Sequence, residues 1–340
     1  MTTQSTPSTE PAGAGHAEEG QGGGHEGGHG GTKAIIAALL ANIGIAIAKF
    51  VAFLFTGAAS MLAESIHSVA DTGNQALLAL GGRRGRQTPT AAHPFGFGRE
   101  RYFWAFLVAV VLFTLGSLFA LFEGYEKLRH PHAIESPAWA FGALLVAVAL
   151  ESWSLRTAIQ EADKVRAGLS WWAFIRRSKS PELPVVLLED VGALLGLGCA
   201  LVGVSLAVVT GESRFDAVGS VAIGLLLGVI AVTLGIEMRS LLIGEAASQA
   251  EVAAIGAALI DGPAVRRLIH LRTLHLGPDE LLVGAKVEFD PALSLAEAAE
   301  AIDEAERRVR AMVPSARIIY LEPDCYRAGA PVERSSAPDP

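Results

Sequence analysis

Residues 183–210 read LPVVLLEDVGALLGLGCALVGVSLAVVT, an apolar stretch long enough to cross a bilayer as a helix. Comparable stretches recur along the chain before Ala250. We expect six membrane spans, over residues 33–56, 58–80, 102–123, 137–158, 183–210 and 214–243. Of the 340 residues, 51% are hydrophobic and 18% are charged, a balance too apolar for a soluble protein of this length. The sequence therefore predicts an α-helical membrane protein.

The two ends of the chain have the composition of disordered tails. Residues 1–32 are rich in Gly, His, Glu, Ser and Thr, and without an apolar run they predict a cytoplasmic tail rather than a cleavable signal peptide. His16, His25 and His29 fit a mobile metal-collecting arm or a plain Gly-rich linker. Residues 327–340 are predicted to be disordered as well.

Residues 245–326 change from long apolar runs to alternating helix and strand patterns. The order is a helix, two strands joined by GPDE, a strongly amphipathic helix and a short strand. This order predicts a cytoplasmic αββαβ domain of the ferredoxin-like kind. Because two helices cover only one face of such a sheet, the other face is available for a partner subunit or for solvent, and we expect a homodimer.

The distribution of charge predicts orientation and excludes some partners. The loops after the second and fourth spans are rich in Arg and Lys, which places both termini in the cytoplasm of a multi-pass protein of the cell inner membrane, although an organelle membrane fits the same physics. The net charge is −8 without a basic cluster, so we expect no nucleic-acid partner. Cys199 and Cys325 form no CxxC pair.

The second span carries polar residues that are costly to place in lipid. In AESIHSVADTGNQ (63–75), Glu64, His67, Asp71 and Asn74 share one helical stripe. His67 and Asp71 are four residues apart, a separation at which two side chains can bind one ion. An imidazole with a carboxylate suits zinc, cobalt, iron or manganese. The alternative is that the stripe only makes hydrogen bonds between helices.

The fifth span supplies two adjacent carboxylates, Glu189 and Asp190, in an otherwise apolar helix. Neighbouring residues on a helix point in different directions, so both cannot easily face one ion. Asp190 is the stronger candidate for a metal ligand. Glu189 either contributes to the site or lies solvated at the cytoplasmic mouth.

Four separated motifs together resemble the cation diffusion facilitators. They are GAASMLAESIHSVADTGNQALL (57–78), HPFGFGRERYFW (93–104), PVVLLEDVGALLG (184–196) and FDAVGSVAIGLLLG (215–228), followed by the αββαβ domain. The resemblance covers about residues 33–325, and the LED version of the third motif is most similar to the zinc-transporter-9-like branch. It implies a homodimer in which each subunit exchanges a cytoplasmic metal ion for a proton by alternating access.

The resemblance also implies a transport site. His67 and Asp71 match the family's ligands on the second span, and Asp190 matches the second ligand on the fifth span. The first ligand of the fifth span falls on Val186, which cannot bind a metal. Glu189, Asn74 or water is then expected to complete the shell.

Two further regions carry residues of metal-binding type. His93 matches one residue of the family's loop-borne site, but Phe97 occupies a second His position, so this site is expected to be degraded or absent. A regulatory metal site in the cytoplasmic domain could draw on several residues whose spacing matches no tight ligand pattern, and solvated strand-edge positions are the alternative. These residues are His270, His275, Asp279, Glu280 and Asp324.

The sequence therefore predicts a divalent transition-metal transporter, with zinc first and cobalt, iron, manganese or cadmium as other substrates. Deprotonation of the ligands on metal binding leads to proton antiport. We expect no resident cofactor and no enzymatic activity, because no HExxH or nucleophile motif occurs in any span. The alternative is a non-transporting membrane scaffold or metal sensor, for which Val186 is the main support.

Overall fold

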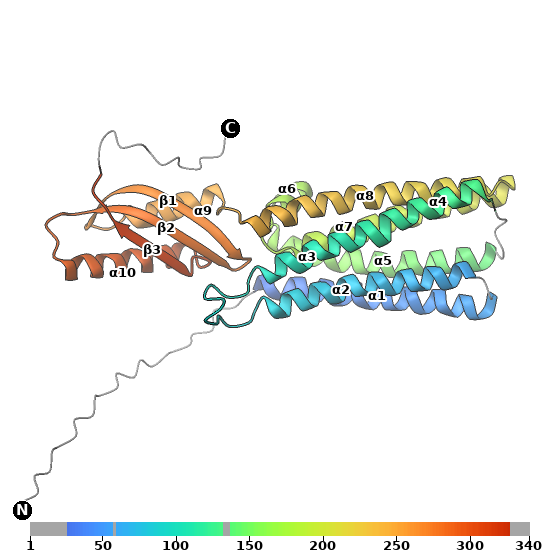
Figure 1. The fold of residues 1–340 in the computed structure, drawn as a ribbon, viewed down its shortest axis with the longest axis horizontal. Helices are drawn as coiled ribbons and strands as arrows, with labels where there is room; N and C mark the ends of the chain where they lie inside the picture. Colours follow the sequence, from blue (N-terminus) through green and yellow to red (C-terminus); the bar gives the residue numbers. More distant parts are fainter. Residues whose placement is uncertain (1–25, 57–58, 132–136, 327–340) are drawn as a thin grey trace, which may run out of the picture.

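The computed structural model describes residues 26–56, 59–131 and 137–326. Long helices lie side by side in one elongated bundle, and a small sheet domain sits at one end of it (Figure 1). The bundle helices are α1 (Glu26–Thr56), α2 (Ala59–Arg84), α5 (Pro137–Val165), α7 (Glu182–Thr210), α8 (Arg214–Ile243), and a segment built from α3 (Glu100–Val111), the π-helical turn η1 (Leu112–Leu118) and α4 (Phe119–Arg129). Together with the sheet domain they confirm the predicted fold class.

Among the described residues, five helical segments are long and apolar enough to cross a membrane: residues 33–51 of α1, the α3–α4 segment, α5, α7 and α8. The polar residues on α2 lower its hydropathy below that of these five. It packs against α1 and α3 within the same bundle. A helix with a polar stripe is stable at that position because its neighbours can satisfy the polar groups.

Several helix ends lie outside the ranges expected from the apolar stretches. α1 begins at Glu26, so residues 26–32 of the expected tail are helical, whereas residues 1–25 lie outside the described part. α5 continues to Val165. A formed helix gains one hydrogen bond for each added residue, so it continues into polar sequence that carries no apolar signal.

A short helix, α6 (Trp171–Arg177), lies in the loop between the fourth and fifth spans, where the sequence predicted only a cation-rich connection. Ser170 precedes it in an extended conformation, and its Oγ accepts a hydrogen bond from the backbone N–H of Ala173 at 3.2 Å. This contact is an N-terminal cap, and it satisfies one of the free N–H groups at the start of the helix.

α8 packs closely against α4, and glycines allow the approach. A Cβ atom at Gly224 would lie 2.8 Å from the backbone nitrogen of Leu121, and one at Gly124 would lie 2.9 Å from the backbone nitrogen of Val221. Ser117 in η1 donates a hydrogen bond to the carbonyl of Gly224 at 2.8 Å. Small residues at such contacts let helix backbones approach each other in a membrane.

The sheet domain has the predicted αββαβ order. Its elements are α9 (Gln249–Ile260), β1 (Val265–Gly277), β2 (Glu280–Phe289), α10 (Leu295–Met312) and β3 (Ile318–Pro323). The strand order is β1-β2-β3, with β1 antiparallel and β3 parallel to β2. Alternate residues of β2, from Leu281 to Phe289, are buried in one core with residues of α9 and α10. Capping boxes at Ser248 and Ser294 start the two helices.

The sheet domain meets the bundle through the turn between β1 and β2. A Cβ atom at Gly98 would lie 2.8 Å from the carbonyl oxygen of Leu276, so the loop before α3 lies directly against the end of β1. Arg101 at the start of α3 is buried, and its guanidinium contacts Glu182 at 2.5 Å and Asp279 in the turn at 3.3 Å. Ion pairs therefore join two bundle helices to the sheet domain.

Replacement of Gly224 by Ala is expected to lower the stability of the bundle by about 1–3 kcal/mol, because the new Cβ meets the Leu121 backbone, which cannot move aside as a side chain can. Thermal denaturation of the purified protein in detergent measures the effect. Gly235→Ala, on the same helix and with no atom within 4 Å of its Cβ, is the matched control and should melt at or above the wild-type temperature. Equal melting temperatures for the two variants would contradict the close α4–α8 contact.

Candidate cation site in the helix bundle

The two acidic residues of α7 are both buried, and they face different neighbours. Glu189 is 9% exposed and Asp190 is 3% exposed. Because successive helical residues differ by about 100° in direction, Glu189 reaches α2 and Asp190 reaches α5. Glu189 is therefore enclosed by the bundle, and the alternative of a solvated carboxylate at the cytoplasmic mouth is wrong.

The Glu189 carboxylate accepts hydrogen bonds from two amides of α2. Asn74 Nδ2 donates to Oε1 at 3.1 Å and Gln75 Nε2 donates to Oε2 at 2.6 Å. The amide oxygens Asn74 Oδ1 and Gln75 Oε1 are also buried, and neither has a hydrogen-bond donor within the described part of the chain. Buried acceptors without donors are rare in proteins, and a cation is one partner that satisfies them.

The Asp190 carboxylate is oriented by α5. Ser154 is fully buried there, and its Oγ donates to Asp190 Oδ2 at 2.8 Å. Glu151 precedes it by one helical turn and is 7% exposed. The charges of Asp71 and Asp190 act on Glu151, and that of Asp71 acts on Glu189. Carboxylates from α2, α5 and α7 thus gather in one region of the bundle.

The structure describes the residues of α2 unevenly. Asp71 is partly buried and interacts with its surroundings. His67 lies one turn before Asp71 on the same helix, but its side chain is outside the described residues, as is that of Glu64. The role of His67 stays a prediction. Among the side chains that are described, which leave out His67, no three His, Cys, Asp or Glu residues are placed to hold a metal ion.

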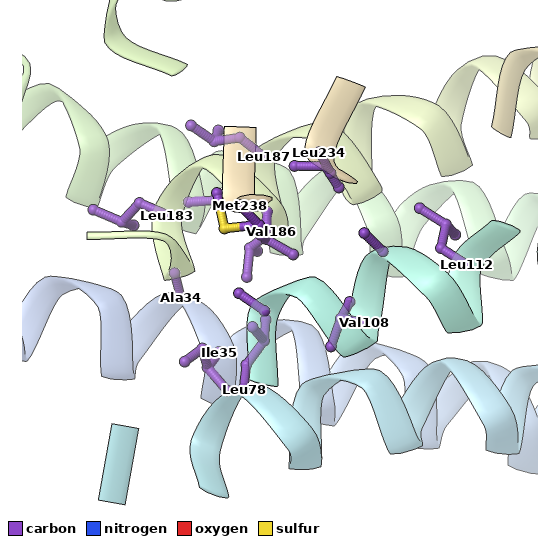
Figure 2. Close-up of a cluster of buried hydrophobic side chains, with 14 of the residues drawn as sticks. Ala34, Ile35, Leu78, Val108, Leu112, Leu183, Val186, Leu187, Leu234 and Met238 are labelled. Atoms are coloured by element: carbon purple, nitrogen blue, oxygen red, sulfur yellow. The ribbon is translucent and has the colours of Figure 1, made fainter. Parts of the chain in front are cut away.

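Val186 lies in an apolar environment. Its side chain is fully buried in the cluster that also contains Leu78, Leu234 and Met238, and Figure 2 shows them close together. The residue stands four positions before Asp190, where the family resemblance places a ligand. In this chain that position contributes packing, and a ligand at the site has to come from another residue.

Three residues of this region were not predicted from the sequence: Gln75, Glu151 and Ser154. Glu151 carried a usable signal, because an acid in the apolar stretch ALLVAVALESW (143–153) is subject to the same cost in lipid that singled out Glu189 and Asp190. Gln75 and Ser154 are neutral and carried none. Polar residues of this kind commonly join membrane helices, and their partners depend on the tertiary structure.

The loop-borne site expected to be degraded shows an aromatic contact. His93 is exposed, and its ring centroid lies 4.7 Å from that of Phe97. A phenyl ring therefore stands beside His93, at the position where the family resemblance expects a second imidazole.

The five residues considered for a regulatory site do not converge. Asp279, Glu280 and Asp324 pair with cations, at 3.3, 3.9 and 3.8 Å from Arg101, Arg317 and Lys286 respectively. His270 is half-buried on β1.

His275 is 2% exposed, so the solvated strand-edge alternative is wrong for this residue. Its backbone N–H donates to the carbonyl of Glu245 at 2.9 Å, at the junction of the two domains. Neither ring nitrogen has a hydrogen-bond partner within the described residues.

The arrangement of an apolar helix bundle with buried carboxylates and an αββαβ domain defines a class of membrane transport protein, and comparison with known families gives the same class. Residues 35–243 match the cation efflux transmembrane domain, and residues 247–324 match the cytoplasmic domain of cation efflux proteins. The chain belongs to the cation efflux family, the cation diffusion facilitators. The resemblance seen in its motifs is confirmed.

Curated relatives come from animals, plants and bacteria. The human proton-coupled zinc antiporter SLC30A9, mitochondrial, is 35% identical over 244 residues, which are 71% of this chain and 43% of the relative. Metal tolerance protein C4 of Arabidopsis thaliana is 32% identical over 263 residues, 76% of this chain and 57% of the relative. The cation-efflux pump FieF of Pectobacterium atrosepticum is 27% identical over 289 residues, 85% of this chain and 91% of the relative. The chain thus spans less than half the length of the human antiporter.

The stability of the protein is expected to fall with acidification through His275. Burial, and then the charge of Lys179, lower the pKa of this imidazole, against raising effects of Glu251, the Gly277 backbone and Glu245. The native state therefore favours the neutral ring. Its contribution to stability is complete above the unfolded pKa of about 6.5 and is lost as the pH falls through the lower folded pKa.

Melting temperatures of the full-length protein in detergent, measured between pH 7.5 and pH 5, test this expectation. The decrease on acidification should be smaller in His275→Leu than in the wild type. His270→Leu, on the same strand but half-buried, is the control and should keep the wild-type pH dependence. If the melting temperature of His275→Leu falls on acidification as much as that of the wild type, a group other than His275 causes the pH dependence.

Proposed function

We propose that this protein exports a divalent transition metal from the cytoplasm in exchange for protons, with Zn²⁺ as the first candidate. The observation that carries the proposal is the gathering of Asp71, Glu189 and Asp190 inside an apolar helix bundle. The family supports it, and so does the human relative, which is named a proton-coupled zinc antiporter. Co²⁺, Fe²⁺, Mn²⁺ and Cd²⁺ are the other substrates to compare, because such ligands do not rank these ions.

The coupling to protons follows from the chemistry of buried carboxylates. Several negative charges in a low-dielectric environment require neutralisation, either by protons or by a metal ion. Metal binding to His67, Asp71 and Asp190 needs these groups deprotonated, so loading of the metal releases protons and the return of protons releases the metal. If the bundle opens alternately to the two sides, a proton gradient drives metal out of the cytoplasm.

The proposal assigns each residue a role. His67, Asp71 and Asp190 bind the metal directly, and Glu189 or Asn74 completes the shell at the level where Val186 is apolar. The hydrogen bond between Asn74 and Glu189 supports this assignment, because it holds both groups in one place. We propose transport rather than catalysis, in keeping with the antiporter and efflux-pump names of the relatives.

The proposed setting is the cell inner membrane, with both termini in the cytoplasm. The cation-rich loops lie at the end of the bundle next to the sheet domain (Figure 1), as the positive-inside rule requires if that domain is cytoplasmic. The bacterial relative is an efflux pump, whereas the human relative is named as mitochondrial. We further propose a homodimer that uses the uncovered face of the sheet.

Uptake of each metal into proteoliposomes with an imposed pH gradient tests the function. Wild-type protein should accumulate Zn²⁺, and His67→Ala, Asp71→Ala and Asp190→Ala should each reduce the rate by about tenfold or more, because each removes a ligand. Asp163→Asn is the control. Asp163 lies near the end of α5 and pairs with Arg166, which follows the helix, so this variant should transport normally. No uptake of any divalent metal by folded wild type would overturn transport and favour the scaffold or sensor.

A further inference from the structure

Glu151 is a buried carboxylate that the proposed ligand set does not use. It stands in α5 with 7% of its surface exposed. Its electrostatic neighbours are Asp190, Asp71 and Lys49. An acid at such a position is expensive in a membrane protein, so it requires a compensating partner.

A second buried acid on the same helix, Glu161, shows how cations of the chain neutralise an acid that has only a structural role. Glu161 is also 7% exposed, but Lys164 lies 2.7 Å from its carboxylate and Lys33 lies 4.0 Å from it. Cations from the chain itself neutralise Glu161. The charges that act on Glu151 are those of Asp190, Asp71 and, last, Lys49, so the chain supplies one cation against two further acids. A bound cation would offset the remaining repulsion.

The face of α5 that carries Glu151 is directed toward the site. Ser154, one helical turn further along, donates its hydrogen bond to Asp190, so this face of α5 looks toward α7. Asp190 and Glu189 each accept hydrogen bonds from side chains.

Independent evidence for a cation comes from α2. The oxygens Asn74 Oδ1 and Gln75 Oε1 are buried beside Glu189, and they lack donors among the described residues. These neutral oxygens are acceptors left over after the hydrogen bonds of the bundle have been formed. A divalent cation is a partner that such oxygen acceptors bind.

We propose that the Glu151 carboxylate is a direct ligand of the transported cation, supplied by α5 in place of the ligand that Val186 cannot provide. The inference rests on the proposed metal transport. It extends the proposed site from two helices to three, with Asp71 on α2, Asp190 on α7 and Glu151 on α5. In the described conformation these three carboxylates are not placed to hold one ion together, so joint binding requires a movement of the helices. Oxygen ligands then outnumber the single imidazole of His67.

Zn²⁺ binding by the purified full-length protein, measured by isothermal titration calorimetry at one pH, tests the inference. Glu151→Gln keeps the size of the side chain and removes its charge, and it should raise the Kd for Zn²⁺ by about tenfold or more. Glu161→Gln makes the same chemical change on the same helix at the same exposure, and it should keep the wild-type Kd. A wild-type Kd in Glu151→Gln would overturn the inference.

A structural ion pair between Glu151 and Lys49 is the competing explanation, and a double variant distinguishes it. If Glu151 only neutralises Lys49, the combination of Lys49→Met with Glu151→Gln should restore the wild-type Kd, and this result would overturn the inference. If Glu151 binds the cation, the double variant should bind Zn²⁺ as weakly as Glu151→Gln alone.

A replacement variant and a parallel uptake measurement complete the test. If Glu151→Gln does not fold, as judged by gel filtration in detergent, Glu151→Asp takes its place; its retracted carboxylate should still raise the Kd, and a wild-type Kd would overturn the inference. Uptake into proteoliposomes is measured in parallel. Wild-type protein that binds Zn²⁺ without proton-driven uptake would refute the proposed transport, while the inference is decided by the binding data.

Discussion

The structure depends on the neutralisation of acidic side chains that an apolar bundle encloses. Asp71, Glu151, Glu189 and Asp190 come from three helices, and their mutual repulsion opposes the packing of those helices. Hydrogen bonds from amides and a hydroxyl offset part of this cost. The remainder requires protons or a metal ion, and the exchange of one for the other is the chemical basis of the proposed antiport.

The contacts around this region differ in kind, and the difference decides which of them can change during transport. α8 meets α4 through glycines whose replacement would bring atoms into backbone contact, so this pair is a rigid unit. α2 meets Glu189 through two amide hydrogen bonds to its carboxylate, each worth roughly 1.5–3 kcal/mol net. Hydrogen bonds of this kind can be exchanged for others when helices move, whereas close backbone packing cannot, so we infer that alternating access moves α2 against α7 rather than α8 against α4.

Much of this architecture could be predicted from the sequence, because long apolar runs and strand alternation are local signals. The six helical segments of the bundle and the αββαβ order were found in this way. The start of α1 at Glu26 and the helix α6 were missed, since polar residues at helix ends carry no apolar pattern. In the site, charge in an apolar helix identified Glu189 and Asp190, whereas Gln75 and Ser154 are recognisable only by their partners in the folded chain.

The junction between the domains connects the sheet to the helix that carries the acids. Arg101 contacts Glu182 at the start of α7 and Asp279 in the β1–β2 turn, and Glu182 lies two helical turns before Glu189 and Asp190. Arg101 and Glu182 are both buried, and loss of one partner of such a pair costs roughly 3–5 kcal/mol. The contact to the exposed Asp279 is weaker, at about 0–1 kcal/mol. A displacement of the sheet domain therefore breaks the contact between Arg101 and Asp279 before the contact between Arg101 and Glu182. Arg101 remains bound to α7 when the domains separate.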